Sequence, residues 1–230
     1  MKQKRRLWFW ISLYTIIVLV GLGLIFNQQI KQALVKEASE GAARQARAMT
    51  PKQIEKNQHV KATYNYNAVK ALNLSAVTRA ALARGLKPIG LISVPSVDIH
   101  LPIMKGITNS NLAVGAATMK PNQEMGKGNY ALAGHHIHGR SLLFSPLERF
   151  KTGSRVYITD LKKIYVYRIT LQKVVDKTQG QYIDDVPKKK LITLVTCASD
   201  MEGQRIRQVL QGELEKTEKA TDAKLRVFEK

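Results

Sequence analysis

A single cysteine, Cys197, closes the run LITLVTC and is the only thiol among the 230 residues. Apolar and β-branched residues fill this run, so it predicts a buried strand that ends at the thiol. About sixty residues earlier, a similar run over 129–134 ends at His135 and His136. A thiol and an imidazole at two strand ends can act as a nucleophile and its proton partner. The pattern predicts covalent chemistry at the cysteine.

The thiol needs a neighbouring group, because a cysteine near its reference pKa of about 8.5 is mostly protonated at neutral pH. His135 or His136 can exchange a proton with it. Two guanidinium candidates, Arg205 and Arg207, follow Cys197 on the next predicted strand. Because alternate strand residues share a face, strand parity does not separate the two arginines. A buried, inert cysteine is the alternative interpretation.

Short strands must position these groups. Seven strand-like runs occur within about 125 residues, and turn signals separate them: 89–94, 97–103, 129–133, 155–159, 164–175, 191–196 and 205–214. Residues 105–112 predict a loop or one helical turn, and 176–190 predict a long polar loop. This spacing is typical of an all-β barrel or sandwich.

The N-terminal segment predicts a membrane anchor. Four basic residues and no acid lie within positions 2–6, and residues 7–26 carry no charge, enough to cross a hydrocarbon core of ~30 Å. Trp8 and Trp10 begin this span, where aromatic rings favour the headgroup layer. The basic flank predicts a cytoplasmic N-terminus and an extracellular remainder. Because the apolar run continues past Gly23, we expect an uncleaved, single-pass anchor in the cell membrane.

Composition divides the chain further. Residues 27–49 are rich in Ala, Gln, Lys and Glu with partial helical spacing, which predicts a solvated helix or stalk. The expected organisation is a basic tip and anchor over 1–26, a stalk or linker over 27–67, an extracytoplasmic catalytic domain over 68–214, and a charged, frayed tail over 215–230.

The net charge is +20, from 37 basic and 17 acidic residues, and +16 remains after the four charges before the span are set aside. A surface of this sign attracts anionic lipid headgroups or wall polyphosphates. Nucleic acid is not expected as a partner, because no recognition motif accompanies the charge.

Two motifs then carry a family resemblance. Residues 193–197 read TLVTC and residues 132–135 read LAGH, and both resemble the TLxTC and LxxH signatures of sortases. The order of anchor, histidine strand, cysteine strand and arginine strand is also similar. The resemblance covers about 89–214 and is greatest to class A, the housekeeping type, since class C adds a lid and a C-terminal span. It implies a closed β-barrel of about eight strands with short helices, preceded by the transmembrane helix and stalk.

The resemblance also implies roles. Cys197 would be the nucleophile, and His135, which completes LAGH, the acid and base. Family members commonly show a glycine five residues after the catalytic arginine. Arg207 and Gly212 fit that spacing, so Arg207 is preferred and Arg205 stays the alternative. His136 is expected to be a supporting or solvated residue.

The implied reaction is transpeptidation. Cys197 would cleave an LPxTG-type sorting signal between Thr and Gly, and an amine of the peptidoglycan precursor lipid II would resolve the thioacyl enzyme. Ala133, Gly134 and Thr196 would line the substrate groove, with ordinary strand packing as the alternative. Two other functions stay open: a membrane-anchored thiol peptidase that hydrolyses its substrate, and a non-enzymatic basic module that binds the wall.

No cofactor is expected. Some class A sortases bind activating calcium through carboxylates before the histidine strand and in the loop before TLxTC. Here residues 115–120 hold no acid, Glu124 is the next one, and the loop offers Asp184 and Asp185 beside three lysines. Because calcium takes six to eight oxygen ligands, we expect calcium-independent activity. No metal is expected at the histidines either, because no acidic or sulfur partner is suitably spaced.

Overall fold

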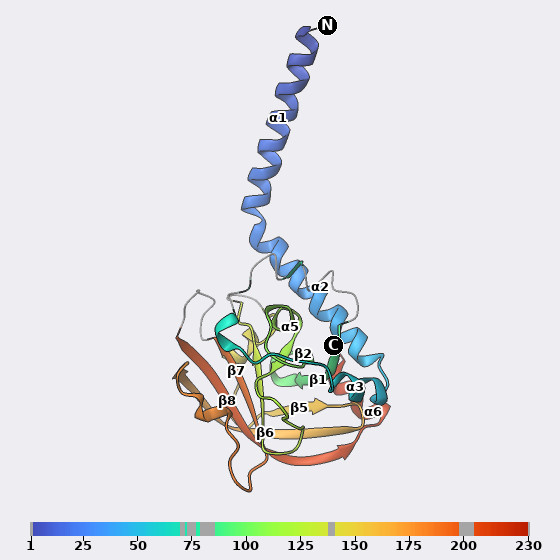
Figure 1. Ribbon diagram of the computed structural model, residues 1–230, viewed down its shortest axis with the longest axis vertical. Coiled ribbons are helices and arrows are strands. Elements are labelled where there is room, and N and C mark those ends of the chain that lie inside the picture. The colour runs from blue at the N-terminus through green and yellow to red at the C-terminus, as the bar shows by residue number, and fades with distance from the viewer. Residues whose placement is uncertain are drawn as a thin grey trace.

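The body of the molecule is a closed, eight-stranded barrel, from which a long helix projects (Figure 1). The computed structural model describes residues 2–69, 72, 77–78, 86–137, 141–197 and 205–229. Its strands are β1 Pro88–Val94, β2 Ile99–Met104, β3 Ala116–Thr118, β4 Asn129–Gly134, β5 Arg155–Thr159, β6 Lys163–Asp176, β7 Leu191–Cys197 and β8 Ile206–Lys219. The predicted all-β barrel is confirmed.

Helices and turns surround the barrel. The α-helices are α1 Lys2–Ile25, α2 Asn27–Arg47, α3 Pro51–Asn57, α5 Asn109–Val114 and α6 Asp222–Leu225. The 3-10 turns are η1 Tyr66–Ala68, η2 Pro95–Val97, η3 Ser145–Arg149, η4 Gly180–Ile183 and η5 Arg226–Phe228. The predicted boundary between residues 67 and 68 therefore falls inside η1.

The strand order is β1-β2-β3-β4-β7-β8-β6-β5, and β5 pairs with β1 to close the barrel. Most neighbours are antiparallel, but β2 and β3 run parallel, and so do β4 and β7, the latter over six residue pairs. The C-terminal ends of parallel strands lie at the same edge of a sheet. The end of β4 and the end of β7 therefore meet at one rim of the barrel.

Strand β3 is absent from the strands that the sequence predicts. It holds only Ala116, Ala117 and Thr118, all buried, and pairs with both β2 and β4. Alanines have no strong strand propensity, and three residues show no alternation to detect. Their small side chains fit between two neighbouring strands, so long-range pairing makes this segment a strand.

The helix predicted over 27–49 is present as α2, but the prediction that it is solvated is wrong. Helix α2 packs against β1, β2 and α5, and α3 packs against β1. One face of α2 is buried: Gln32, Val35, Ala38, Ser39, Ala42, Ala43 and Ala46. Alanine buries little apolar area per residue, so this stripe reads as weakly amphipathic in the sequence. The same small side chains let α2 lie close to the barrel.

The prediction that residues 215–230 form a frayed tail is also wrong. Strand β8 continues to Lys219, which pairs with Lys163 of β6, and η5 then buries Phe228, 1% exposed. Backbone carbonyls of this segment are bound as well. Ser93 Oγ donates to the oxygen of Val227 at 2.6 Å, and Arg47 Nη1 donates to that of Phe228 at 3.2 Å. Tertiary contacts therefore order a segment whose composition is mostly charged.

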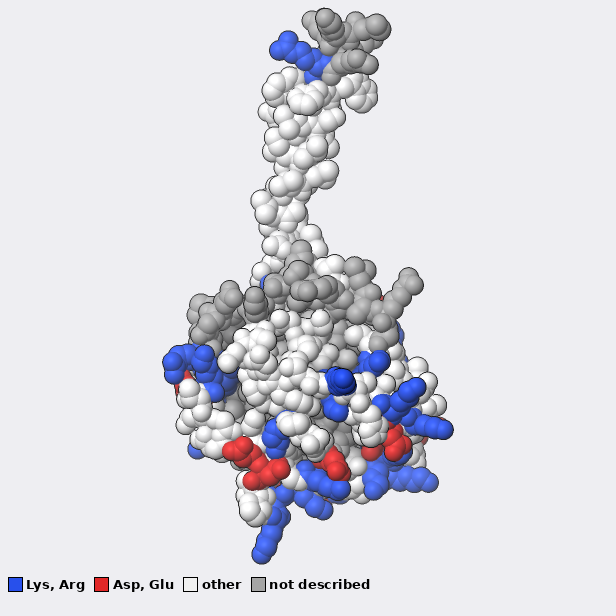
Figure 2. Space-filling model, viewed as in Figure 1, with Lys and Arg blue, Asp and Glu red and all other residues white. Residues whose placement is uncertain are grey.

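Helix α1 contains a stretch suited to a membrane. Trp8–Ile25 is apolar and long enough to cross a bilayer, and none of it is buried against the rest of the described chain. Beyond its basic tip, the helix projects from the barrel as a column without charged side chains, whereas Lys and Arg are scattered over the barrel (Figures 1 and 2). This arrangement is consistent with the predicted anchor.

Candidate active site

Three neighbouring strands bring the predicted catalytic residues to one rim of the barrel. Gly134 and Thr196 are register partners in the parallel pair β4–β7, and the next residues of the chain are His135 and Cys197. Cys197 is in turn the register partner of Arg207 in the antiparallel pair β7–β8. Residues far apart in sequence therefore become neighbours through strand pairing alone.

His135 is a buried imidazole, only 8% exposed. Its Nε2 atom has no hydrogen-bond partner among the residues that the structure describes. Burial lowers the pKa of His135 to about 4, because the protonated ring loses its solvation. The imidazole is therefore neutral at pH 7 in this structure, which is the form that accepts a proton, and burial makes it a weaker base than an exposed imidazole.

The two candidate arginines have different surroundings. Arg205 is exposed and forms an ion pair with Asp176 at the end of β6, with Nε 3.0 Å from Oδ2. This hydrogen bond holds the pKa of the Asp176 carboxyl well below its usual range. Arg207 lies inside β8, is half-buried, and is the residue paired with Cys197. The geometry favours Arg207 over Arg205, as the spacing to Gly212 does, and the assignment stays a prediction.

The predicted groove residues lie on the same two strands. Ala133 is half-buried and pairs with Ala117 on one side and Val195 on the other. Thr196 is 2% exposed, and its Oγ1 has no hydrogen-bond partner in the described part of the chain. A buried hydroxyl without a partner is uncommon, and a bound ligand is one group that could satisfy it. The substrate-binding role of both residues stays a prediction.

Gly134 has a packing role that the sequence does not reveal. A Cβ atom at this position would lie 2.4 Å from Cγ of Phe144, so the phenyl ring occupies the space that a side chain would need. Phe144 is fully buried. The glycine beside His135 therefore admits an aromatic ring from the segment before η3.

Three further residues next to the site are missed by sequence reasoning. His136 Nε2 hydrogen-bonds Oε1 of Glu148, and Gln208 Nε2 donates to the oxygen of Leu147 at 3.1 Å. Ser145 Oγ accepts a hydrogen bond from the backbone of Ile137 at 2.6 Å. No local signal marks Glu148, Ser145 or Gln208, because their partners lie on other elements.

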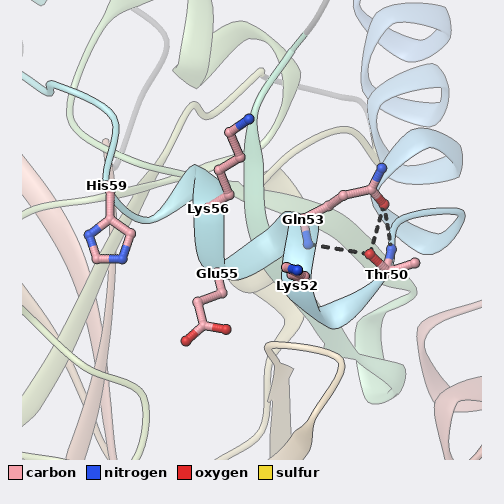
Figure 3. A pocket seen from close by; sticks show the side chains of 6 residues that line it. All are labelled: Thr50, Lys52, Gln53, Glu55, Lys56 and His59. Atoms are coloured by element: carbon pink, nitrogen blue, oxygen red, sulfur yellow. Dashed lines mark hydrogen bonds between the residues drawn. The ribbon is translucent and has the colours of Figure 1, made fainter.

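A hollow of about 560 Å³ lies elsewhere, over α3 (Figure 3). Thr50 caps α3 by accepting from the backbone of Gln53 at 3.3 Å, and Glu55 forms an ion pair with Lys162 at 2.8 Å. The six lining residues are Thr50, Lys52, Gln53, Glu55, Lys56 and His59. None of them is a predicted site residue.

Comparisons with known proteins agree with this geometry. A sortase domain family model matches residues 92–215. Sortase A of Streptococcus agalactiae serotype III is 41% identical over 211 residues, covering 89% of this chain and 84% of that protein. Sortase A of Listeria monocytogenes is 41% identical over 208 residues, covering 90% and 91%. The chain belongs to the sortase family.

Solved structures support the same assignment. The structure of Listeria monocytogenes sortase A is 45% identical, with a TM-score of 0.59 over 61% of this chain and 96% of that chain. Sortase C-3 of Streptococcus pneumoniae reaches a TM-score of 0.61 at 19% identity, which supports the fold alone. The relatives confirm the class A resemblance, and the chain is a cysteine transpeptidase of that class.

Proposed function

We propose that this membrane-anchored transpeptidase cleaves an LPxTG-type signal between Thr and Gly, using Cys197 as nucleophile, His135 as acid and base, and Arg207 as hydrogen-bond donor. The observation that carries the assignment of residues is the strand register. It brings the ends of β4 and β7 together and pairs Cys197 with Arg207.

The first half-reaction forms a thioester. The neutral imidazole of His135 accepts the thiol proton of Cys197, and the sulfur attacks the carbonyl carbon of the signal threonine. The C–N bond to glycine then breaks, and His135 returns the proton to the departing amine. The enzyme is left acylated, with the imidazole neutral again.

The second half-reaction transfers the acyl group. An amine of the lipid-linked peptidoglycan precursor attacks the thioester carbonyl, His135 accepts its proton, and the sulfur leaves and is reprotonated. Water is far more concentrated than any acceptor, so the amine must be held in place to compete. The product is a surface protein joined to the wall precursor by a new amide bond.

Arg207 stabilises the negative charge that develops on the carbonyl oxygen in both steps. A guanidinium offers several fixed N–H donors, and donors placed before the reaction need no reorganisation. Ala133 and Thr196 line the groove that holds the peptide backbone. The hydroxyl of Thr196, next in sequence to the nucleophile, has no hydrogen-bond partner among the described residues, which supports this role.

The membrane places enzyme and acceptor at one surface. Helix α1 spans the bilayer, with the basic residues of positions 2–6 on the cytoplasmic side and the barrel outside. An excess of basic residues on the barrel suits an anionic, lipid-linked acceptor (Figure 2). The partners are therefore LPxTG-bearing proteins and the lipid II amine, and nucleic acid is not among them.

Activity without calcium is part of this proposal. Lys120 Nζ lies 2.7 Å from Oδ1 of Asp185, and the backbone N–H of Asn129 donates to the same oxygen at 2.7 Å. The hydrogen bond from Lys120 also lowers the pKa of Asp185. Glu124 forms an ion pair with Lys127 at 2.6 Å. Lysines thus already neutralise carboxylates that a calcium ion would need.

The calcium prediction is tested by measuring the ligation rate of chelator-treated enzyme before and after excess calcium is added. We expect the same rate in both, with magnesium as the control for ionic strength. A several-fold increase with calcium alone would contradict the prediction.

The function is tested with the full chain in detergent, an LPxTG-type peptide and triglycine as acceptor, with products followed by mass spectrometry. We expect a ligated peptide that disappears in the Cys197→Ala variant. Hydrolysed peptide without ligation would support a thiol peptidase instead. Absence of cleavage, together with wall binding that survives thiol alkylation, would support the binding module.

A further inference from the structure

The turn η3 and the residues before it bind the ends of two catalytic strands. Phe144 N donates to the backbone oxygen of His135 at 3.0 Å, and Ile137 N donates to Ser145 Oγ at 2.6 Å. His135 and Ile137 lie just after Gly134, the last residue of β4. The oxygen of Leu147 accepts from the side chain of Gln208, the residue after Arg207 on β8. One short segment therefore holds the backbones that carry His135 and Arg207.

Packing makes this segment rigid. Phe144 and Leu147 are both fully buried in the barrel core. The ring of Phe144 fills the space beside Gly134, directly before His135. Close-packed interiors resist displacement, so a movement of this segment is transmitted to the strand end that it contacts.

The contact between His136 and Glu148 is the polar part of this arrangement. The His136 side chain is 1% exposed, whereas that of Glu148 is 49% exposed, and Nε2 of the imidazole bonds Oε1 of the carboxylate. A half-exposed carboxylate loses side-chain freedom when it is held against a buried ring. The partner of this carboxylate is adjacent in sequence to the proposed acid and base.

A histidine that acts as acid and base is usually oriented by a third group, such as a carboxylate. Within the described residues, no group hydrogen-bonds Nε2 of His135, and the nearby carboxylate of Glu148 binds His136 instead. The backbone hydrogen bond from Phe144 and the packing beside Gly134 are then the described contacts that orient His135. A contact that fixes the backbone of the neighbouring residue, His136, therefore also affects the orientation of His135.

We propose that Glu148 is a positioning residue: by bonding His136 it fixes the backbone that aims His135 at the reacting atoms. In this proposal Glu148 acts through His136 and is assigned no contact with the substrate. The inference rests on the proposed role of His135, and it assigns to the second histidine of the pair a task distinct from that of the first.

The expected effect is on turnover. A misplacement of about 1 Å can cost up to 10²-fold in rate, so we expect Glu148→Ala to lower kcat by roughly 10-fold. KM for the sorting peptide should change little, because the groove residues Ala133 and Thr196 lie on β4 and β7 rather than on η3. Glu148→Gln keeps an oxygen acceptor and should retain most of the activity.

The matched control is Arg149→Ala, one position further along η3. Arg149 is exposed and donates to Ser141 Oγ at 3.0 Å, and in the described part of the chain it makes no hydrogen bond to His136. Its kcat and KM should equal those of the wild type. Because Glu148→Ala leaves the buried Nε2 of His136 without its carboxylate partner, a modest fall in the unfolding temperature is expected. Kinetics are therefore measured well below the unfolding temperature of every variant, which separates positioning from global instability.

A second readout does not depend on ligation. The imidazole resonance of His135 is assigned in the labelled full chain by comparison with His135→Asn. We expect Glu148→Ala to shift and broaden that resonance and Arg149→Ala to leave it unchanged. A wild-type kcat and an unshifted resonance in Glu148→Ala would overturn the positioning role. If the wild type failed to ligate, the proposed function would be wrong, and the resonance would still decide whether Glu148 positions His135.

Discussion

At the scale of single residues, the two arginines after Cys197 show how surroundings assign a role. Both have the same side chain and share strand parity, but Arg205 is held at the surface by Asp176. Exposed ion pairs contribute little free energy, so Arg205 has the properties of a solvated surface residue. Arg207 lies on the strand next to Cys197 and is partly removed from water. Reduced solvation strengthens its interaction with a developing negative charge.

Substitution of the two arginines should therefore have unequal effects. We expect Arg207→Ala to lower kcat/KM by about 10²- to 10³-fold, the usual cost of removing one oxyanion donor. Arg205→Ala is the matched control and should stay close to the wild type. Steady-state ligation kinetics measure both. A larger loss in Arg205→Ala than in Arg207→Ala would reverse the assignment.

Because the imidazole of His135 is buried, we expect the free energy of unfolding to depend on pH. Its pKa is about 4 in the folded chain and 6.5 in the unfolded chain. The unfolded state therefore binds more protons between these values, and the free energy of unfolding falls as pH falls from 6.5 to 4. The difference in pKa corresponds to a total loss of about 3 kcal/mol, complete below pH 4.

Urea unfolding at several pH values between about 7.5 and about 4 measures this loss in the detergent-solubilised chain. The His135→Asn variant should lack this part of the pH dependence, because asparagine does not titrate. Carboxylates with lowered pKa values, such as Glu218 at about 2, contribute equally to the pH dependence of stability in the wild type and the variant. Parallel curves for wild type and variant would show that the pKa of His135 is not lowered.

At the scale of elements, the C-terminal segment is a structural part of the barrel. Phe228 packs in a cluster with Ala46 of α2, Leu91 of β1 and Ile164 of β6. The carbonyl of Phe228 also accepts a hydrogen bond from Arg47. The last turn of the described chain thus joins the barrel to the helix that continues from the membrane anchor.

Removal of this ring should destabilise the whole domain. Phe228→Ala is expected to lower the free energy of unfolding by about 3–5 kcal/mol, typical for a buried phenylalanine. For a chain of this size, the unfolding temperature should fall by roughly 10 °C. Glu229→Ala, the exposed neighbour, is the control. Equal unfolding temperatures for both variants would mean that the segment does not stabilise the barrel.

At the scale of the whole molecule, the charge of +20 is its most general property. Many basic residues form ion pairs, including Arg155 and Arg168 with Glu215, but the excess remains over the barrel surface (Figure 2). Such a field attracts anionic molecules over distances of about 10 Å at 0.1 M salt. It would concentrate an anionic acceptor near the enzyme.

The rate should therefore depend on salt in a manner specific to the acceptor. We expect kcat/KM for an anionic, lipid-linked amine to fall as ionic strength rises, because screening shortens to about 3 Å at 1 M. A short neutral acceptor such as glycinamide is the control and should respond less. A flat salt response with the lipid-linked amine would exclude electrostatic steering.

The sequence by itself determined most of the strands, the apolar N-terminal helix and the chemical groups of the candidate site. Seven of the eight strands follow from local alternation and apolar runs, and the motifs TLVTC and LAGH are contiguous, so each is legible without its surroundings. Strand periodicity is a short-range property, and sequence analysis recovers it for that reason.

Only the tertiary structure decided the contacts between distant segments. In the folded chain Arg205 contacts Asp176 and His136 contacts Glu148. The alanine face of α2 packs against the barrel, and Phe228 is buried. No local sequence pattern predicts these contacts, because each one forms between two elements, and neither sequence taken alone indicates burial or pairing. Closure of the barrel brings them together, and burial then gives weakly apolar or charged residues a structural role.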